Sequence, residues 1–161
     1  MVKNIPFHET LDLTIIGTMG RVHRICREAI TVAVEPLGLT QSRWMVLMHI
    51  NINREGLTQL ELANSLGIEM PSLTRTLKQL EEQSLITRRI DEHDKRSKQI
   101  YFTKQGLATL DSLTEIISHI KAQLYDGFTD EQLDAMAYGL VKMEKNAHHC
   151  IKFQTKAKND T

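Results

Sequence analysis

One short segment of the chain carries polar side chains and cations at spacings that suit contact with a polyanion. Leu73, Leu77 and Leu80 recur every three or four residues, so in a helix they form the buried face. The opposite face and its flanks carry Pro71, Ser72, Thr74, Arg75, Lys78, Gln79 and Glu82. An arginine can form two hydrogen bonds with a guanine edge, and a serine can bond a base or a phosphate. The pattern favours a helix that enters the major groove of DNA, and the alternative is a solvated, charged surface.

A second group of cations lies between two segments rich in β-forming residues. Ile86–Ile90 is predicted to be a strand and residues 99–103 its partner, with a hairpin tip between them. Arg88 and Arg89 are neighbours on the first strand and therefore point to opposite faces. The charged residues of the tip include Asp94, Lys95, Arg96 and Lys98. A basic tip can enter a narrow, A·T-rich minor groove; the alternative is a solvated turn in which Asp94 pairs with Arg96.

Two short helices must position the first group. Thr58 and Glu61 form a capping box, in which each side chain can bond the other residue's amide. Gly67 breaks this helix, and Pro71 falls in the first turn of the next, where its missing N–H costs nothing. Ala63 is small where the two helices cross. These spacings predict a helix-turn-helix over residues 62–76, and the alternative is a helical hairpin with no role in DNA binding.

Amphipathic helices are predicted on both sides of this module. Apolar residues recur at helical steps over residues 9–35, and Pro36 ends that helix. A second helix follows Thr40, a suitable N-cap, and runs to about Asn51. Beyond the hairpin, apolar periodicity returns over residues 107–124 and again over 133–147, and the polar tail from residue 152 is expected to be frayed.

The order of these elements predicts a mainly α fold with a small β-hairpin wing. We expect a single domain over residues 1–161, with a winged helix-turn-helix lobe for DNA binding over about residues 40–104. Residues 9–36 and 105–150 supply the N- and C-terminal dimerisation helices, because their apolar stripes exceed what one central module can cover. The last segment, residues 152–161, is the tail.

Composition narrows the function further. The 161 residues contain 20 Lys or Arg and 20 Asp or Glu, so any attraction for nucleic acid must be local. No apolar run approaches the roughly 18 residues of a membrane span, and the N-terminus lacks the pattern of a secretory signal, so we expect a cytoplasmic protein. The sequence has no glycine-rich phosphate loop, zinc-protease motif or nucleophile motif, which argues against an enzyme.

The two cysteines offer weaker chemistry. Cys26 and Cys150 are far apart and lack C-x-x-C spacing, so neither a disulfide framework nor a zinc site is predicted. The apolar periodicity around Cys26 favours a buried structural thiol over a redox sensor. His148, His149 and Cys150 are adjacent, and adjacent helical residues point about 100° apart, so we predict no shared metal and no cofactor.

Residues 73–102 and their surroundings resemble the MarR family of bacterial winged-helix regulators. The resemblance rests on the segments S-L-T-R-T-L at 72–77, Q-L-E at 79–81, L-I-T-R at 85–88 and D-K-R at 94–96. The Asp-x-Arg pattern of the wing is the most specific of these marks, and the similarity extends over about residues 15–148. The segments L-T-Q-S-R-W at 39–44 and G-I-E-M-P-S at 67–72 resemble the SlyA branch in particular.

This resemblance implies a homodimer that reads a pseudo-palindromic, A·T-rich operator and controls stress or virulence genes. The first and last helices would interlock two subunits, Pro71, Ser72 and Arg75 would enter the major groove, and Lys95 and Arg96 would lie at the wing. SlyA-like wings usually carry arginine at both positions after the aspartate, whereas this chain has Lys95 at the first. Lysine lacks the planar guanidinium fork, so we expect a weaker preference for minor-groove shape.

The resemblance also implies an effector, since many members bind small aromatic carboxylates such as salicylate. The candidate ligands are Arg24, Arg27, Trp44 and Met48, which offer two cations and apolar walls. A solvated helix face explains the arginines equally well, and a core position is favoured for Trp44. A winged-helix module that binds only proteins is the alternative function, but it would need neither an outward Arg75 nor a basic wing.

Overall fold

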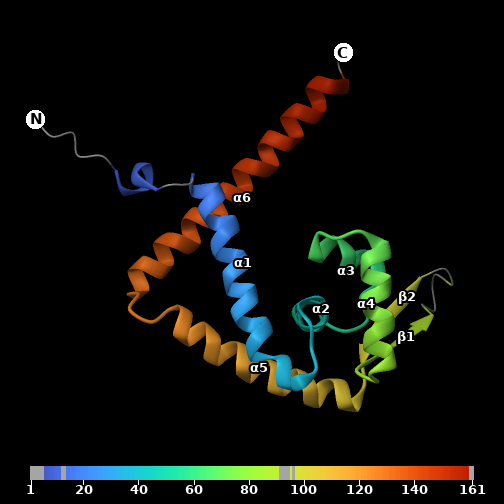
Figure 1. Ribbon diagram of the computed structural model, residues 1–161. Coiled ribbons are helices and arrows are strands. Elements are labelled where there is room, and N and C mark those ends of the chain that lie inside the picture. Colours follow the sequence, from blue (N-terminus) through green and yellow to red (C-terminus); the bar gives the residue numbers. More distant parts are fainter. Residues whose placement is uncertain (1–5, 12–13, 91–94, 96, 160–161) are drawn as a thin grey trace, which may run out of the picture. The chain divides into compact units, whose positions relative to one another are not determined.

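The computed structural model describes residues 6–11, 14–90, 95 and 97–159, with side chains up to residue 156 (Figure 1). Within these residues the chain forms six α-helices, two short 3-10 helices and one antiparallel pair of strands. This mainly helical architecture with a β-hairpin wing confirms the predicted fold class. The chain divides into two compact units, Met1–Leu124 and Tyr125–Thr161, and each is described by itself.

The first α-helix begins later than the apolar periodicity predicted. Helix α1 spans Ile15–Ala33, and the Thr14 hydroxyl caps it by accepting a hydrogen bond from the Gly17 amide at 3.2 Å. Phe7–Thr10 forms a separate 3-10 helix. The prediction of one helix from residue 9 is therefore wrong, because Thr14 supplies an N-cap that interrupts the helical pattern.

A 3-10 helix, Glu35–Leu37, connects α1 to helix α2, which spans Gln41–Asn53. Thr40 is the residue before α2, as predicted, but its hydroxyl makes no capping hydrogen bond. It instead accepts a hydrogen bond from Nε of Arg43 at 3.1 Å. Helix α2 packs against α1 and against the next two helices of the chain, so it lies at the centre of the larger unit.

The predicted helix-turn-helix is present. Helix α3 spans Gln59–Leu66, and the capping box of Thr58 and Glu61 is formed in both directions. Gly67 ends α3 with a φ of 64°, in the left-handed region that favours glycine. Helix α4 then spans Met70–Glu82.

The core of the larger unit is built from aliphatic side chains of these helices and of the elements that follow. The largest fully buried side chains are Leu47, Ile50, Leu62, Leu73, Leu77, Leu80, Ile100 and Leu113. The three leucines predicted to form the inner face of α4 are among them. The outer face of α4 is therefore fixed toward solvent by the burial of its inner face.

The wing consists of strand β1, Ile86–Ile90, and strand β2, Lys98–Phe102. They pair antiparallel, with Arg88 opposite Ile100. The first strand is as predicted, and the second begins and ends one residue earlier than the predicted 99–103.

The loop before α3 pairs with the other edge of β2, which the sequence did not predict. The Gly56 amide donates to the Ile100 carbonyl at 2.8 Å, and the Ile100 amide donates to the Leu57 carbonyl at 3.1 Å. The Glu55 carboxylate accepts a hydrogen bond from the Phe102 amide. The wing is thereby anchored to the helix-turn-helix along its base.

Helix α5, Lys104–Leu124, follows the wing directly. A Cβ atom at Gly106 would lie 1.8 Å from the carbonyl oxygen of Leu85, so only glycine permits this approach of the helix to the start of β1. Leu110, Leu113 and Ile117 bury the inner face of α5 in the core.

The second unit is dominated by helix α6, Asp130–Asn159. Thr129 and Gln132 cap its start reciprocally, through hydrogen bonds of 2.9 and 3.3 Å. The prediction of a frayed tail from residue 152 is wrong, since α6 continues to Asn159. The segment contains no glycine or proline, and its lysines, glutamine and alanine are good helix formers.

Candidate nucleic-acid interface

The outer face of α4 presents most of the predicted DNA-contacting side chains to solvent. Pro71, Ser72, Thr74, Arg75 and Lys78 are exposed, and Gln79 is half-buried. Lys78 pairs with Glu82 at 3.8 Å, between two exposed side chains. Among the described residues Arg75 has no ion-pair partner, so its guanidinium is available to a ligand.

Two hydroxyl groups of α4 are used within the helix. Thr74 Oγ1 donates to the Met70 carbonyl at 2.8 Å, and Thr76 Oγ1 donates to the Ser72 carbonyl at 3.2 Å. Thr76 lies on the buried face, which explains why its hydroxyl must be satisfied locally. The Thr74 hydroxyl oxygen still has lone pairs to accept from a partner in solution.

Arg88 links three elements of this surface. Its Nη1 donates to Oε1 of Gln59 in α3 at 2.9 Å, and its Nη2 donates to Oε2 of Glu81 in α4. The side chain of Arg88 is only 15% exposed. The hydrogen bond from Arg88 and its positive charge hold the pKa of Glu81 below the ordinary value, against the opposing effect of burial.

Arg89 contacts different partners, as its neighbouring position on the strand requires. Its guanidinium lies over the ring of Tyr101, 4.8 Å from the centroid. The Tyr101 hydroxyl donates to Oε1 of Gln99 at 2.6 Å. Arg89 is exposed, but it is stacked on the strand rather than extended from it.

A pocket of about 480 Å³ lies where α3, the start of α4 and the two strands meet. It brings together three predicted residues, Thr74, Arg88 and Lys98, from three different elements. The sequence reasoning missed Leu60 and Met70, which also line it. Leu60 is 60% exposed although apolar, a property of the folded chain that no spacing in the sequence indicated.

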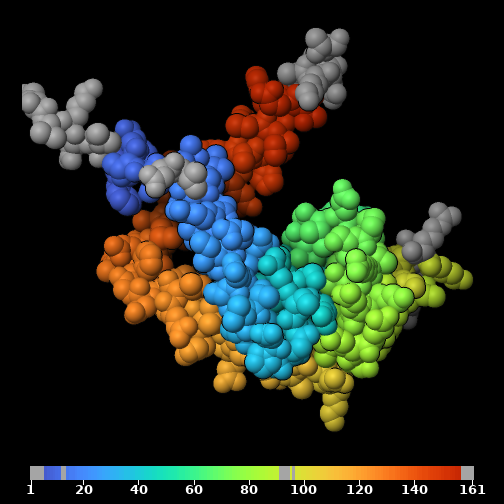
Figure 2. All heavy atoms as spheres, viewed as in Figure 1, coloured from blue at the N-terminus to red at the C-terminus, as the bar shows by residue number. Residues whose placement is uncertain are grey.

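The tip of the wing is described only in part. Lys95 is exposed in a turn, and Lys98 is exposed at the start of β2. Asp94 and Arg96 lie outside the described residues. Figure 2 shows α4 and the wing strands as neighbouring parts of one surface of the larger unit.

The predicted effector residues have separate environments. Trp44 is 7% exposed and donates from Nε1 to Thr31 Oγ1 at 3.0 Å, so it belongs to the core, the position that the sequence favoured. Arg24 is exposed and pairs with Glu28 at 3.7 Å. Met48 packs against the core.

Arg27 is the unusual member of this set. Its Nη1 lies 3.8 Å from Sδ of Met45, a weak acceptor. Its Nε is buried and has no hydrogen-bond partner among the described residues. A half-buried guanidinium with an unpaired donor can accept an anionic partner.

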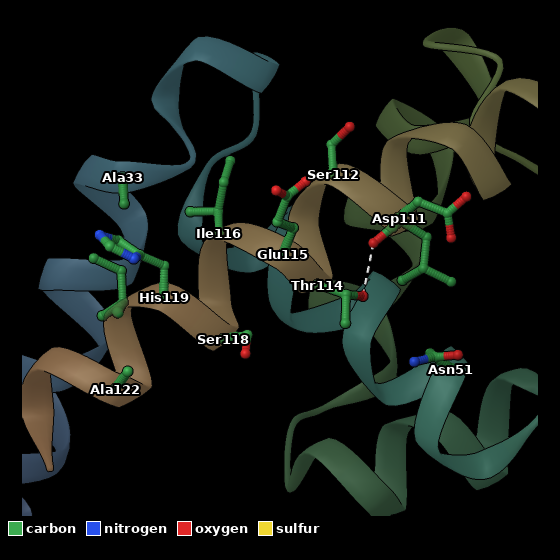
Figure 3. A pocket seen from close by; sticks show the side chains of 12 residues that line it. Ala33, Asn51, Asp111, Ser112, Thr114, Glu115, Ile116, Ser118, His119 and Ala122 are labelled. Atoms are coloured by element: carbon green, nitrogen blue, oxygen red, sulfur yellow. Dashed lines mark hydrogen bonds between the residues drawn. The ribbon is translucent and has the colours of Figure 1, made fainter.

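A larger groove, of about 1150 Å³, runs along α5 and does not include any of the four predicted effector residues (Figure 3). Ala33 and Asn51 lie at its margins, and the rest of its lining comes from α5, including Asp111, Glu115 and His119. No group of three or more potential metal ligands occurs among the described residues. The described helices also include none with the length and apolarity needed to cross a bilayer.

Both cysteines are free thiols. Cys150 is exposed, and Cys26 is partly exposed rather than buried, which corrects the prediction of a buried thiol. The reason is that α1, taken in the single chain, buries none of its residues. Its apolar stripe is only half covered by the rest of the chain.

Comparison with known proteins identifies the fold. A family model described as MarR family matches residues 37–97, which include α2, α3, α4 and β1. The structure of transcriptional regulator PA3341 is 30% identical, with a TM-score of 0.77, and the match covers 83% of this chain and 98% of that one. The transcriptional regulator SlyA is 24% identical, with a TM-score of 0.76, and the match covers 88% and 99% of the two chains.

A third similar structure is that of the transcriptional repressor CouR bound to a 23-mer DNA duplex. It is 25% identical with a TM-score of 0.73, and the match covers 81% of this chain and 92% of that one. The matches extend well beyond the helix-turn-helix to the flanking helices, since they cover over four-fifths of the chain. The chain therefore belongs to the MarR family of winged-helix, DNA-binding transcriptional regulators, which are not enzymes.

Proposed function

We propose that this chain is a sequence-specific transcriptional regulator that binds pseudo-palindromic, A·T-rich operators as a homodimer. The observation that carries the proposal is the outer face of α4, where Arg75 is exposed and without an ion-pair partner among the described residues. A helix held by its buried leucines and exposing an arginine in its N-terminal half suits readout of the major groove. The DNA-bound state of CouR supports the same use of the fold.

The proposed contacts divide by groove. The major-groove set is on α4 and consists of Pro71, Ser72, Thr74, Arg75, Lys78 and Gln79. The wing set, for the flanking minor groove, consists of Asp94, Lys95, Arg96 and Lys98. Arg88 belongs to the same surface, although its guanidinium already contacts Glu81 and Gln59.

The proposed dimer is supported by exposed apolar side chains on the flanking helices. Those of α1 are Ile15, Ile16, Val22, Ile25 and Val32, and those of α6 include Met136, Tyr138, Leu140, Val141, Ile151 and Phe153. Exposed apolar stripes of this kind mark interaction surfaces in soluble proteins. A two-fold dimer would separate the two copies of α4, the proposed recognition helix, by about 34–36 Å, which is one turn of DNA.

We further propose a small aromatic carboxylate as effector, with Arg27 as the anion partner and Met48 and the edge of Trp44 as apolar walls. The support is the buried Nε of Arg27, which has no hydrogen-bond partner among the described residues, and the contact of its Nη1 with Sδ of Met45 on α2, the helix that also carries Trp44 and Met48. Arg24 would be a peripheral cation, since it already pairs with Glu28. In this proposal the protein is cytoplasmic, associates with the nucleoid when it is bound to DNA, and controls genes of stress or virulence responses.

The first experiment compares a labelled A·T-rich inverted-repeat duplex with a scrambled duplex of the same composition across a salt series. We expect tighter binding to the repeat and a steep decrease of affinity with salt, because phosphate contacts release counterions. Equal binding to both duplexes would contradict sequence-specific readout of such repeats. Absence of binding to either duplex at low salt would instead support a module that binds only proteins.

A further inference from the structure

The link between Arg88, Glu81 and Gln59 joins the wing to both helices of the helix-turn-helix. Arg88 lies in the middle of β1, Gln59 is the first residue of α3, and Glu81 lies in the last turn of α4. The two terminal nitrogens of one guanidinium contact the two helices separately. We refer to these three residues as the wing clamp.

Both terminal nitrogens of Arg88 already donate a hydrogen bond inside the protein. Nη1 donates to Gln59, Nη2 donates to Glu81, and Nε is buried without a partner among the described residues. The guanidinium has five N–H donors, so these two bonds do not use all of them. A side chain that is only 15% exposed and held by two partners would nevertheless have to leave them to turn its planar fork toward a phosphate. Arg88 is thus poorly placed for a direct contact with DNA.

The wing clamp lies where it can set the direction of the wing. In the part of the chain that the structure describes, the wing clamp supplies side-chain hydrogen bonds from β1 to both α3 and α4, in addition to the backbone pairing of β2 with the loop before α3. The side chains of Arg88 and Glu81 are 15% and 31% exposed, so removing Glu81 leaves a mostly buried cation without its ion-pair partner. A change in either partner should therefore shift the wing rather than leave it in place.

We infer that Arg88 and Glu81 are positioning residues, which fix the wing against α4 so that both reach one DNA site together. The inference rests on the proposed DNA-binding function and deepens it. It assigns a favourable role in DNA binding to an acidic residue, Glu81, which a simple charge argument would count as unfavourable. Positioning by Glu81 therefore predicts that removing its charge weakens DNA binding, whereas charge attraction alone predicts that removing it strengthens binding.

The test compares Glu81→Gln with Glu82→Gln on the inverted-repeat duplex that the wild-type dimer prefers. Both substitutions remove one negative charge from the end of α4, but Glu82 contacts only Lys78 among the described ion pairs. We expect Glu81→Gln to lower specific affinity about tenfold, as for loss of one charge-assisted hydrogen bond, while Glu82→Gln leaves it equal or tighter. Nonspecific affinity should not fall in either variant.

Two further readouts separate positioning from phosphate contact. Hydroxyl-radical footprinting of the Glu81→Gln complex should lose protection at the flanking minor grooves and keep it at the α4 contacts. Arg88→Lys keeps the charge but loses the fork, so positioning predicts a large loss of affinity with an unchanged salt slope. A direct phosphate contact predicts near-normal affinity for Arg88→Lys and a salt slope lower by about one in Arg88→Gln.

Gln59→Ala keeps the test decisive if the charged variants fold poorly, because it removes a neutral partner and no charge. We expect about a threefold loss of specific affinity, the size of one ordinary hydrogen bond. Variants Glu81→Gln and Gln59→Ala that bind as tightly as Glu82→Gln, with flanks still protected, would overturn the inference. A wild-type protein without specific binding would instead overturn the proposed function.

Discussion

At the residue scale, Arg75 and Arg88 have opposite environments, although both were predicted from the sequence to lie on the DNA-binding surface. Arg75 is exposed and has no ion-pair partner among the described residues, whereas Arg88 is largely buried and contacts both helices of the helix-turn-helix. Spacing on α4 was enough to place Arg75 outward, because the burial of three leucines fixes the face. Spacing alone could not predict the environment of Arg88, because its partners depend on how α3, α4 and β1 pack together.

Arg75→Ala should weaken specific DNA binding by about 1–3 kcal/mol and relax the base preference at one position of each half-site. The reason is that a contact with a base adds binding free energy only for duplexes that carry the matching base at that position. Lys78→Ala is the matched control on the same helix face, and it should weaken binding to all sequences and reduce the salt slope by about one. Titration of both variants on matched and scrambled duplexes checks this, and an Arg75→Ala protein with unchanged preference would contradict it.

Gly106→Ala should destabilise the fold by at least about 2 kcal/mol, because the new Cβ would overlap the Leu85 carbonyl and a backbone atom cannot rotate away. Gln105→Ala, an exposed change in the same turn of α5, should change stability by less than about 0.5 kcal/mol. Urea unfolding at one protein concentration measures both. Equal midpoints for the two variants would show that α5 can move away from β1 at little cost.

At the element scale, the features that could be predicted from the sequence are those encoded by near neighbours. The capping box at Thr58, the turn at Gly67 and the strand Ile86–Ile90 each depend on residues a few positions apart. The features that could not be predicted join distant segments. Glu55 and Phe102 are 47 positions apart, and Gln59 and Arg88 are 29 apart, so no local pattern indicates either contact.

The same distinction explains the errors at helix ends. The periodicity of apolar residues ran across the true start of α1, because Leu11 continues the spacing although Thr14 caps the helix. The polar composition of residues 152–159 led to the prediction of a frayed tail. A polar segment still forms a helix when its residues are good helix formers. In the candidate site, exposure on α4 was predictable, whereas the pocket with Leu60 and Met70 required three elements to be placed.

The link between α4 and β1 should give the fold a measurable dependence on pH. The pKa of Glu81 is lower in the folded chain than its ordinary value of about 4.3, so ionised Glu81 stabilises the fold. This contribution is present above the ordinary pKa and is lost as the pH falls through the folded-state pKa. Urea unfolding from pH 6 to pH 3 should show a smaller loss of stability in Glu81→Gln than in Glu82→Gln. Parallel curves for the two variants would contradict the assigned ion pair.

At the scale of the whole molecule, the single chain leaves apolar surface that an isolated soluble protein would rarely expose. The α1 side chains illustrate this, since Ile16 is 71% exposed and no residue of α1 is buried. Membership of the MarR family accounts for the fold and for DNA binding, and the SlyA branch stays a prediction. The oligomeric state is the property on which the proposed operator geometry depends.

Sedimentation velocity at micromolar concentration should show a dimer. Ile16→Asp should raise the dimer dissociation constant by at least about tenfold, because a buried charge at an apolar interface is costly. Ile52→Asp is the matched control, since Ile52 is 69% exposed but lies on α2, outside the flanking helices. A wild-type monomer, or equal effects of the two substitutions, would contradict dimerisation through α1.

The pairing of β2 with the loop before α3 has a consequence for how the molecule opens. Ile100 is fully buried, with β1 on one side and Gly56 and Leu57 on the other, so its amide is hydrogen-bonded across a seam between two segments. That amide can meet solvent only when strand, loop and the start of α3 separate together. Its exchange with deuterium should therefore be as slow as the slowest amides of α4, which would make the base of the wing one cooperative unit with the helix-turn-helix.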